Sequence, residues 1–254
     1  MTGNTEYITY LRKADEGMNF DSLLDELSEQ LGDLLEKGKI VFLERDTPVV
    51  DGVAFVGVCG WWNFRMGEGV FAEDTVTEGI KNFHYPHPEI TGQLIADRAE
   101  IEAEMLAERV AALQLRADVK EIVVVTHTAS HPELVRPQWT ETTAYIQQML
   151  NLGKNTPNSS LKLVFRQAIN QEKPDLLLHV IGAYTGNPSM KKVVEADVFG
   201  KISQWFYGHI HRANDRMIEH DNGHVIQYIN ASKGQPNDRP RGEKTLYRPK
   251  NLII

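Results

Sequence analysis

The sequence predicts an α/β or layered α+β domain. Helical spacing of apolar residues alternates with short, continuously apolar runs through the middle of the chain, and a β-hairpin signature follows near its end. No repeat, low-complexity tract or linker divides the 254 residues. One domain spanning residues 1–254 is therefore the simplest organisation.

The first predicted elements are a helix and three short strands. From Asp21 to Lys37 leucines recur mainly at steps of three and four residues, with acidic residues near the start and Gly38 after the end. This pattern is typical of an amphipathic helix. Runs rich in β-branched residues, separated by Arg45-Asp46 and Asp51-Gly52, predict strands joined by tight turns. These strands are Ile40 to Leu43, Thr47 to Val50 and Val53 to Val58.

A long helix and a buried strand come next. From about Thr91 to Arg116 apolar residues recur on one side, while most acidic residues fall elsewhere. The residues expected on the apolar side are Leu94, Ile101, Met105, Val110 and Leu113. The segment Ile122 to Val125 is continuously apolar and ends at Thr126-His127, as expected of a central strand buried on both faces.

The second half of the chain predicts further helices, strands and a hairpin. Asp221-Asn222-Gly223 favours a hairpin turn, because these residue types tolerate positive φ. Its strands are Met217 to His220 and Val225 to Ile229. The other expected elements are helices around Tyr145 to Met149 and Leu161 to Ile169, strands at Leu176 to Ile181 and Trp205 to Tyr207, and a loop at Gly234 to Gly242.

Composition excludes several classes of protein. With 35 acidic and 27 basic residues, the formal charge of −8 argues against a general electrostatic grip on nucleic acid or an anionic membrane, although a local basic patch is not excluded. The first twenty residues lack the apolar core of a signal peptide, and no apolar run approaches the roughly 20 residues of a membrane span. The lone Cys59 cannot form an internal disulfide, so the expected location is the cytoplasm.

Three short segments carry candidate chemistry. In Gly208-His209-Ile210-His211 alternation puts both imidazoles on one side of a strand end, where they could ligate a metal or form a buried, hydrogen-bonded structural pair. His127 follows a buried strand, where ligand sites collect in α/β sheets, although a structural role is also open. Asn4, in Gly3-Asn4-Thr5-Glu6, carries a carbonyl oxygen that could ligate a metal. The alternative is that this stretch is an ordinary chain terminus.

In this order, the three segments resemble the metal-binding motifs of the calcineurin-like metallophosphoesterases. That family carries Gly-Asn-His-Glu, a strand followed by His, and Gly-His-x-His. Gly52 to Trp62 also resembles the family's strand leading to Gly-x-x-x-Trp, and Pro240-Arg241-Gly242 its late Pro-Arg-Gly element. The resemblance covers essentially the whole chain and implies a layered α/β/β/α sandwich that lacks the family's first strand-helix-strand unit.

The resemblance implies hydrolysis of phosphate mono- or diesters by two divalent metal ions. Asn4, His127 and His209 would ligate one ion and His211 the other, with Asn4 counted among the catalytic groups as well. Oxygen and imidazole ligands suit manganese, iron or zinc. The implied partner is a small phosphate ester; a nucleic-acid substrate is less favoured and no membrane partner is expected.

The chain also departs from the family pattern. The family's first strand-helix-strand unit bears Asp-x-His and Gly-Asp-x-x-Asp motifs, and neither is found here; Thr5 stands where the family has a proton-donating histidine. Either the reading frame starts upstream, or a natural truncation has produced an incomplete protein. We therefore expect weak or no activity from this chain alone. The alternative is a binding or regulatory protein that has lost catalysis and docks to a partner chain supplying the missing strands.

Five other residues lie in or near the motifs that carry the resemblance. His131, four residues after His127, is a hypothetical substitute for the missing acid. Arg241 could contact a phosphate or form a surface salt bridge. Trp61-Trp62 could form an aromatic wall beside the site, although a packing role is favoured. Cys59 is expected to be a small core residue.

Overall fold

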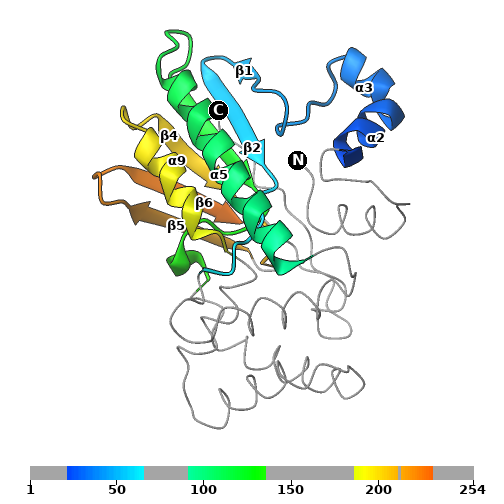
Figure 1. Cartoon of the computed structure of the whole chain (residues 1–254). Coiled ribbons are helices and arrows are strands. Elements are labelled where there is room, and N and C mark those ends of the chain that lie inside the picture. The colour runs from blue at the N-terminus through cyan, green and yellow to red at the C-terminus, as the bar shows by residue number, and fades with distance from the viewer. Residues whose placement is uncertain (1–21, 66–90, 136–185, 211–212, 231–254) are drawn as a thin grey trace, which may run out of the picture.

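The fold is a mixed α/β arrangement built on a six-stranded sheet with the strand order β1-β2-β3-β4-β6-β5 (Figure 1). This computed structural model describes residues 22–65, 91–135, 186–210 and 213–230. The strands are β1 (Val49–Val50), β2 (Val53–Val58), β3 (Glu121–Thr126), β4 (Ile202–Phe206), β5 (Asn214–Glu219) and β6 (Val225–Asn230). Neighbours among β2, β3, β4 and β6 pair in parallel, whereas β1 and β5 join the edges antiparallel. The carboxyl ends of the four parallel strands therefore lie at one edge of the sheet.

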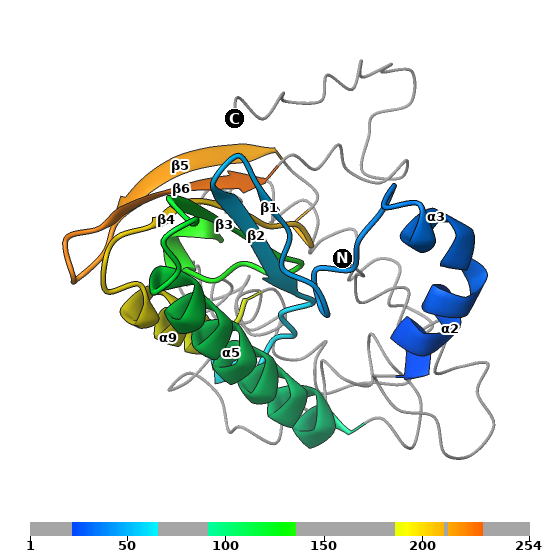
Figure 2. The same ribbon diagram turned by 90° about the horizontal axis from the view of Figure 1, so that it is seen from above.

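Two helices cover one face of this sheet. Helix α5 (Gly92–Gln114) packs on β2 and on α9 (Lys191–Ala196), and both views show the two helices along the same side of the strands (Figures 1 and 2). The described chain also contains two single-turn 3-10 helices. Helix η2 (Pro132–Leu134) follows β3, and η5 (Pro188–Met190) directly precedes α9. None of the helices in the described segments has the length and apolar character that a membrane span requires.

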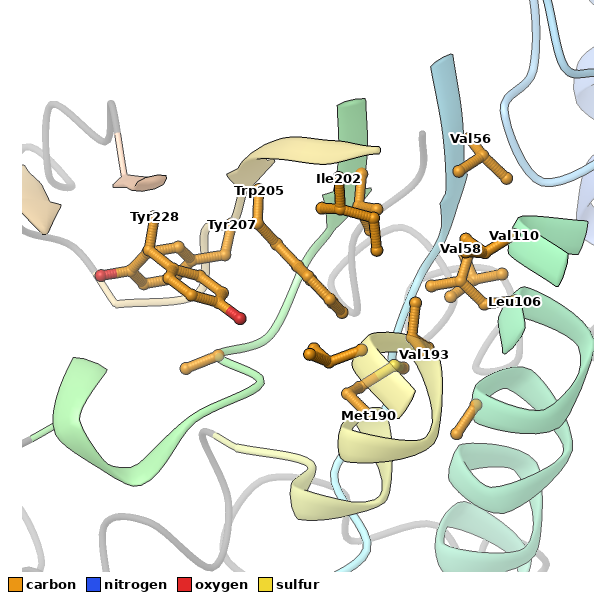
Figure 3. Packing of buried hydrophobic residues seen from close by; sticks show 14 of the residues in the cluster. Val56, Val58, Leu106, Val110, Met190, Val193, Ile202, Trp205, Tyr207 and Tyr228 are labelled. Atoms are coloured by element: carbon orange, nitrogen blue, oxygen red, sulfur yellow. The ribbon is translucent and has the colours of Figure 1, made fainter. Parts of the chain in front are cut away.

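The main core lies between the sheet and these helices. Strand register places Val56, Val124, Trp205 and Tyr228 in one row across β2, β3, β4 and β6. All four side chains are buried, and Figure 3 shows Val56, Trp205 and Tyr228 in one cluster with Leu106 of α5 and Val193 of α9. Burial of this row in the helix interface fixes the register, because a shift by one residue would turn the row to the other face.

Several predicted elements are confirmed. Strand β3 is buried between two parallel neighbours, as its unbroken apolar run indicated. The β1–β2 turn has positive φ at Asp51 and Gly52, and the β5–β6 hairpin turns at Gly223 with a φ of 80°. Thr91 begins α5 by accepting a hydrogen bond from the Leu94 amide, which makes it the N-cap of the predicted helix.

The helix predicted from Asp21 to Lys37 is wrong as a single element. The chain forms α2 (Ser22–Gln30) and α3 (Gly32–Glu36), and the φ of −106° and ψ of 10° at Leu31 interrupt the helix between them. Gly32 favours the break, since glycine costs a helix about 1 kcal/mol relative to alanine.

The strand predicted at Ile40 to Leu43 does not form either. This segment enters a turn in which the amides of Arg45 and Asp46 both donate to the Phe42 carbonyl. The Leu43 carbonyl, which a strand would use for pairing, accepts a hydrogen bond from Arg109 of α5 instead. The following strand is correspondingly short, with only Val49–Val50 of the predicted Thr47 to Val50 in the ladder.

The buried face of α5 also differs from the prediction. Leu94, Ile101 and Met105 are 42%, 49% and 40% exposed, whereas Val110 and Leu113 are buried as expected. The stripe that faces the sheet contains Ile95, Ala99, Glu102, Ala103 and Leu106. Small alanine side chains let the long helix approach the strands closely. The close packing that results favours this face over the one that carries the larger apolar side chains.

The remaining predicted elements lie outside the described residues. These are the helices around Tyr145 to Met149 and Leu161 to Ile169, the strand Leu176 to Ile181 and the loop Gly234 to Gly242.

Candidate functional site

Two imidazoles meet at the carboxyl edge of the parallel sheet. His127 directly follows β3, and His209 lies three residues beyond the end of β4. The Nδ1 atom of His209 lies 3.1 Å from Nε2 of His127, and the ring centroids are 5.0 Å apart at an angle of 77°. Both residues are half-buried. The pairing of β3 with β4 thus brings together two side chains that are 82 positions apart in the sequence.

Backbone hydrogen bonds fix the segments that carry these histidines. The His127 amide donates to the Cys59 carbonyl at 2.8 Å, and the Gly208 amide donates to the His127 carbonyl at 3.0 Å. The Tyr207 amide donates to the Ile229 carbonyl at 3.0 Å. Interstrand bonding therefore continues past the last ladder pair and holds the strand ends together, which provides a rigid base for ligands.

His209 occupies a strained backbone conformation. Its φ is 59°, and the Ile210 amide donates to the Gly208 carbonyl at 2.6 Å, so His209 is the central residue of a three-residue turn. A γ-turn with positive φ is rare for a residue with a side chain, and strain of this kind concentrates at functional sites. The Asn230 side-chain amide donates to the Ile210 carbonyl at 2.7 Å and stabilises the turn from β6.

An aromatic segment after β2 packs against the same histidine. The Trp62 ring lies 5.2 Å from the His209 ring, and Trp61 lies 5.4 Å from Trp62. Both tryptophans are only 1% exposed, so they support the site by packing and present no open surface to a ligand. Cys59 is also fully buried, as expected of a core residue.

A buried carboxylate on α5 holds this aromatic segment in place. Oε2 of Glu102 accepts hydrogen bonds from the amides of Gly60, at 2.5 Å, and Trp61, at 3.4 Å. Oε1 of the same carboxylate accepts from Nε of Arg98 at 2.8 Å. Burial raises the pKa of Glu102, against the opposing effect of Arg98 and the two amides. Sequence reasoning missed this residue, although Glu102 has helical spacing with Ala99 and Leu106 on the face that proves to be buried.

A second carboxylate on the same helix anchors the end of the aromatic segment. Glu100 accepts hydrogen bonds from the Asn63 side chain at 2.7 Å and from the Ser189 hydroxyl at 2.5 Å. Burial acts to raise its pKa, but the hydrogen bonds from Ser189, Asn63 and Lys192 and the charge of Arg65 together outweigh that effect and hold the pKa of Glu100 below its ordinary value. Helix α5 therefore holds the segment after β2 at both ends, through hydrogen bonds from Gly60 to Glu102 and from Asn63 to Glu100.

His131 takes part in a different set of contacts. Its Nδ1 accepts a hydrogen bond from the Glu133 amide at 3.2 Å and caps η2. Its ring packs edge-on against His220, with centroids 5.7 Å apart, and His220 shares a 2.9 Å hydrogen bond with the Tyr228 hydroxyl. Burial lowers the pKa of His220, and His131 adds to that shift.

The other predicted site residues lie outside the described part of the chain. These residues are Asn4, Thr5, His211 and Arg241. Among the described residues, no group of three or more His, Cys, Asp or Glu side chains lies close enough to hold a metal ion. His127 and His209 are the predicted ligands that the structure brings together.

The donor chemistry of this pair suits a shared cation. Two imidazole nitrogens, each about 2.0–2.1 Å from one ion, would be separated by about 2.8–3.4 Å in octahedral or tetrahedral geometry. The 3.1 Å separation falls within that range, and it also suits a direct N–H···N hydrogen bond. Comparison of the chain with protein-family models, with curated proteins and with solved structures finds no match.

Proposed function

We propose that this chain is a metal-dependent hydrolase of phosphate mono- or diesters, of the calcineurin-like metallophosphoesterase type. Its metal ligands are Asn4, His127, His209 and His211, and its ions are divalent manganese, iron or zinc. The observation that carries the proposal is the 3.1 Å approach of two imidazole nitrogens at the edge where parallel strands end. The substrate is a small phosphate ester of the cytoplasm.

The proposed fold is the layered α/β/β/α sandwich of that family. Helices α5 and α9 form the outer layer on one face of the sheet (Figure 2). Register places an apolar row of Val125, Phe206 and Ile229 on the opposite face, next to a row in which Val123 aligns with the polar Gln204 and Gln227. An apolar row on the second face of a parallel sheet favours a further layer against that part of the sheet.

The chain's own residues have separable roles in the proposed reaction. Bound divalent ions would polarise the phosphoryl oxygens and lower the pKa of a water molecule for attack. The γ-turn and Trp62 orient the His209 ring, while the backbone bond to Cys59 orients His127. Arg241 is proposed to bind the phosphate, and His131 to donate the proton that Thr5 cannot supply.

Metal content and turnover test the proposal directly. The purified chain should contain Mn, Fe or Zn. Added manganese should stimulate hydrolysis of nitrophenyl phosphate or bis-nitrophenyl phosphate, weakly in this chain alone and more strongly when upstream in-frame residues are included. His127→Ala and His209→Ala should lose the metal and the stimulated turnover. His224→Gln is the matched control, because His224 lies in the hairpin turn at the amino end of β6, away from the carboxyl edge.

Two outcomes would contradict the catalytic proposal. A folded chain that retains no metal and shows no metal-stimulated turnover, both alone and when extended by upstream in-frame residues, would end it. Equal metal content in the wild type and in both histidine variants would show that the pair is a structural hydrogen bond. Unchanged turnover in His131→Ala would remove the proton-donor role alone.

The second candidate is a binding or regulatory protein with this fold and no catalysis, docked to a partner chain. Thr5 in place of a histidine favours it, as does the lack of a third close His, Cys, Asp or Glu ligand within the described segments. A second chain that co-purifies at fixed stoichiometry, with metal bound but no turnover, would support this candidate. A monomer with a full metal complement and turnover would exclude it.

A further inference from the structure

The segment after β2 forms a small anion-binding concavity that the protein fills with its own carboxylate. Gly60 has a φ of 69°, and the successive amides of Gly60 and Trp61 point at the same oxygen of Glu102. Successive backbone N–H groups around a left-handed residue are a recurrent anion site. Here the anion comes from α5, and Glu102 is only 2% exposed.

The same short segment touches both histidines. On one side the Cys59 carbonyl accepts the His127 amide at 2.8 Å. On the other, Trp62 packs on the His209 ring with 5.2 Å between centroids. The Thr128 hydroxyl also donates to the Gly60 carbonyl, which ties the segment to the residue after His127. Movement of this segment would therefore move the supports of both imidazoles together.

We propose that Glu102 is a positioning residue for the two-histidine site: its carboxylate fixes the Cys59 to Trp62 segment, and that segment holds the His127 backbone and the His209 ring. The expected effect of Glu102 on metal binding rests on the proposed function, whereas its expected effect on the positions of the two imidazoles does not. Arg98 completes the arrangement by satisfying the second carboxylate oxygen, so that Glu102 is fully engaged in the interior.

A structural role alone would have a different signature. A buried ion pair that only supports the core would, when weakened, lower the unfolding temperature and leave the imidazoles of the folded protein unchanged. A positioning role must alter the environment of His127 and His209 in protein that is still folded. Glu102→Gln is the informative change, because the amide keeps the shape of the side chain but sets an N–H donor against either Arg98 or the Gly60 amide.

The test compares the full-length wild type, Glu102→Gln and Glu104→Gln. Glu104 is the matched control, since it lies two residues along the same helix and its partner is the half-exposed Lys192. The first measurement is the nitrogen-15 NMR spectrum of the imidazole side chains without metal. The second is a cobalt(II) titration followed by visible absorption. Far-UV circular dichroism establishes that each protein is folded.

We expect Glu102→Gln to shift the imidazole resonances of both His127 and His209 and to weaken cobalt binding about tenfold or more, as loss of groups that orient ligands commonly does. Glu104→Gln should change neither. Unshifted resonances of both histidines in folded Glu102→Gln protein would overturn the proposal, whatever the metal result.

Failure of the proposed function has its own pattern. If the wild type binds no cobalt while Glu102→Gln still shifts both histidines, the positioning role stands and the metal site is excluded. Should Glu102→Gln fail to fold, Glu102→Asp takes its place, because it keeps the charge but is one methylene too short to reach Arg98 and both amides together. Wild-type imidazole resonances in folded Glu102→Asp protein would then refute the proposal.

Discussion

Replacement of Gly60 by alanine should be among the more damaging single-methyl additions to this protein. Gly60 combines a φ of 69° with close neighbours: a Cβ placed there would lie 3.1 Å from Cβ of Thr126 and 3.3 Å from Cε of Met190. Thr126 is fully buried and Met190 is 1% exposed, so both would have to shift within the core to admit the added methyl group.

The cost of Gly60→Ala has two contributions, backbone strain at a positive φ and overpacking of the core, and a control variant separates them. A side chain in the left-handed region costs about 1–2 kcal/mol. Overpacking a filled core adds about 1–3 kcal/mol. Gly60→Ala should therefore lower the free energy of unfolding by about 2–5 kcal/mol. Gly223→Ala is the matched control, since Gly223 has a φ of 80° but nothing within 4 Å of its Cβ position, and it should cost only the first contribution.

Urea unfolding followed by circular dichroism measures both variants. Any loss of entropy in the unfolded chain on changing glycine to alanine is shared by the two and cancels in their difference. The expected result is that Gly60→Ala is less stable than Gly223→Ala by at least about 1 kcal/mol. Equal destabilisation of the two variants would refute the argument that the segment after β2 is tightly packed on β3.

Two further predictions concern stability. Burial lowers the pKa of His220, so the unfolded chain takes up a proton more readily than the folded one. The protein should therefore lose stability as the pH falls through 6.5, the ordinary pKa of histidine. His220→Gln should flatten the plot of unfolding temperature against pH between pH 7.5 and 5. A parallel curve for the variant would contradict this. Asp197→Asn should cost about 1–3 kcal/mol, because the fully buried carboxylate accepts from the amides of Lys201 and Ile202, one on each oxygen. In the same urea titration the exposed control Asp118→Asn should stay within about 0.5 kcal/mol of the wild type, and an equal loss in both variants would exclude the mechanism.

Elements with strong local signals were predictable from the sequence. The β5–β6 hairpin formed where Asp221-Asn222-Gly223 indicated, because a turn depends on the φ preferences of the residues within it. Helix α5 begins after the Thr91 cap and β3 lies at an unbroken apolar run, as expected. The prediction of the buried face of α5 was wrong, because spacing alone does not say which of two overlapping stripes packs against the sheet. Ile95, Ala99 and Leu106 form one stripe, while Leu94 and Ile101 lie on the other.

The candidate site divides in the same way between local signals and long-range contacts. Placing His127 and His209 at strand ends required only the apolar runs before them, so the sequence was enough to select these two residues. Their 3.1 Å approach depends on β3 pairing with β4, a contact between distant parts of the chain. The left-handed turn at His209 and the burial of Glu102 likewise arise from packing against other elements. Local preferences chose the residues, whereas long-range pairing decided which of them meet, because interactions between distant segments have no counterpart in the preferences of single residues.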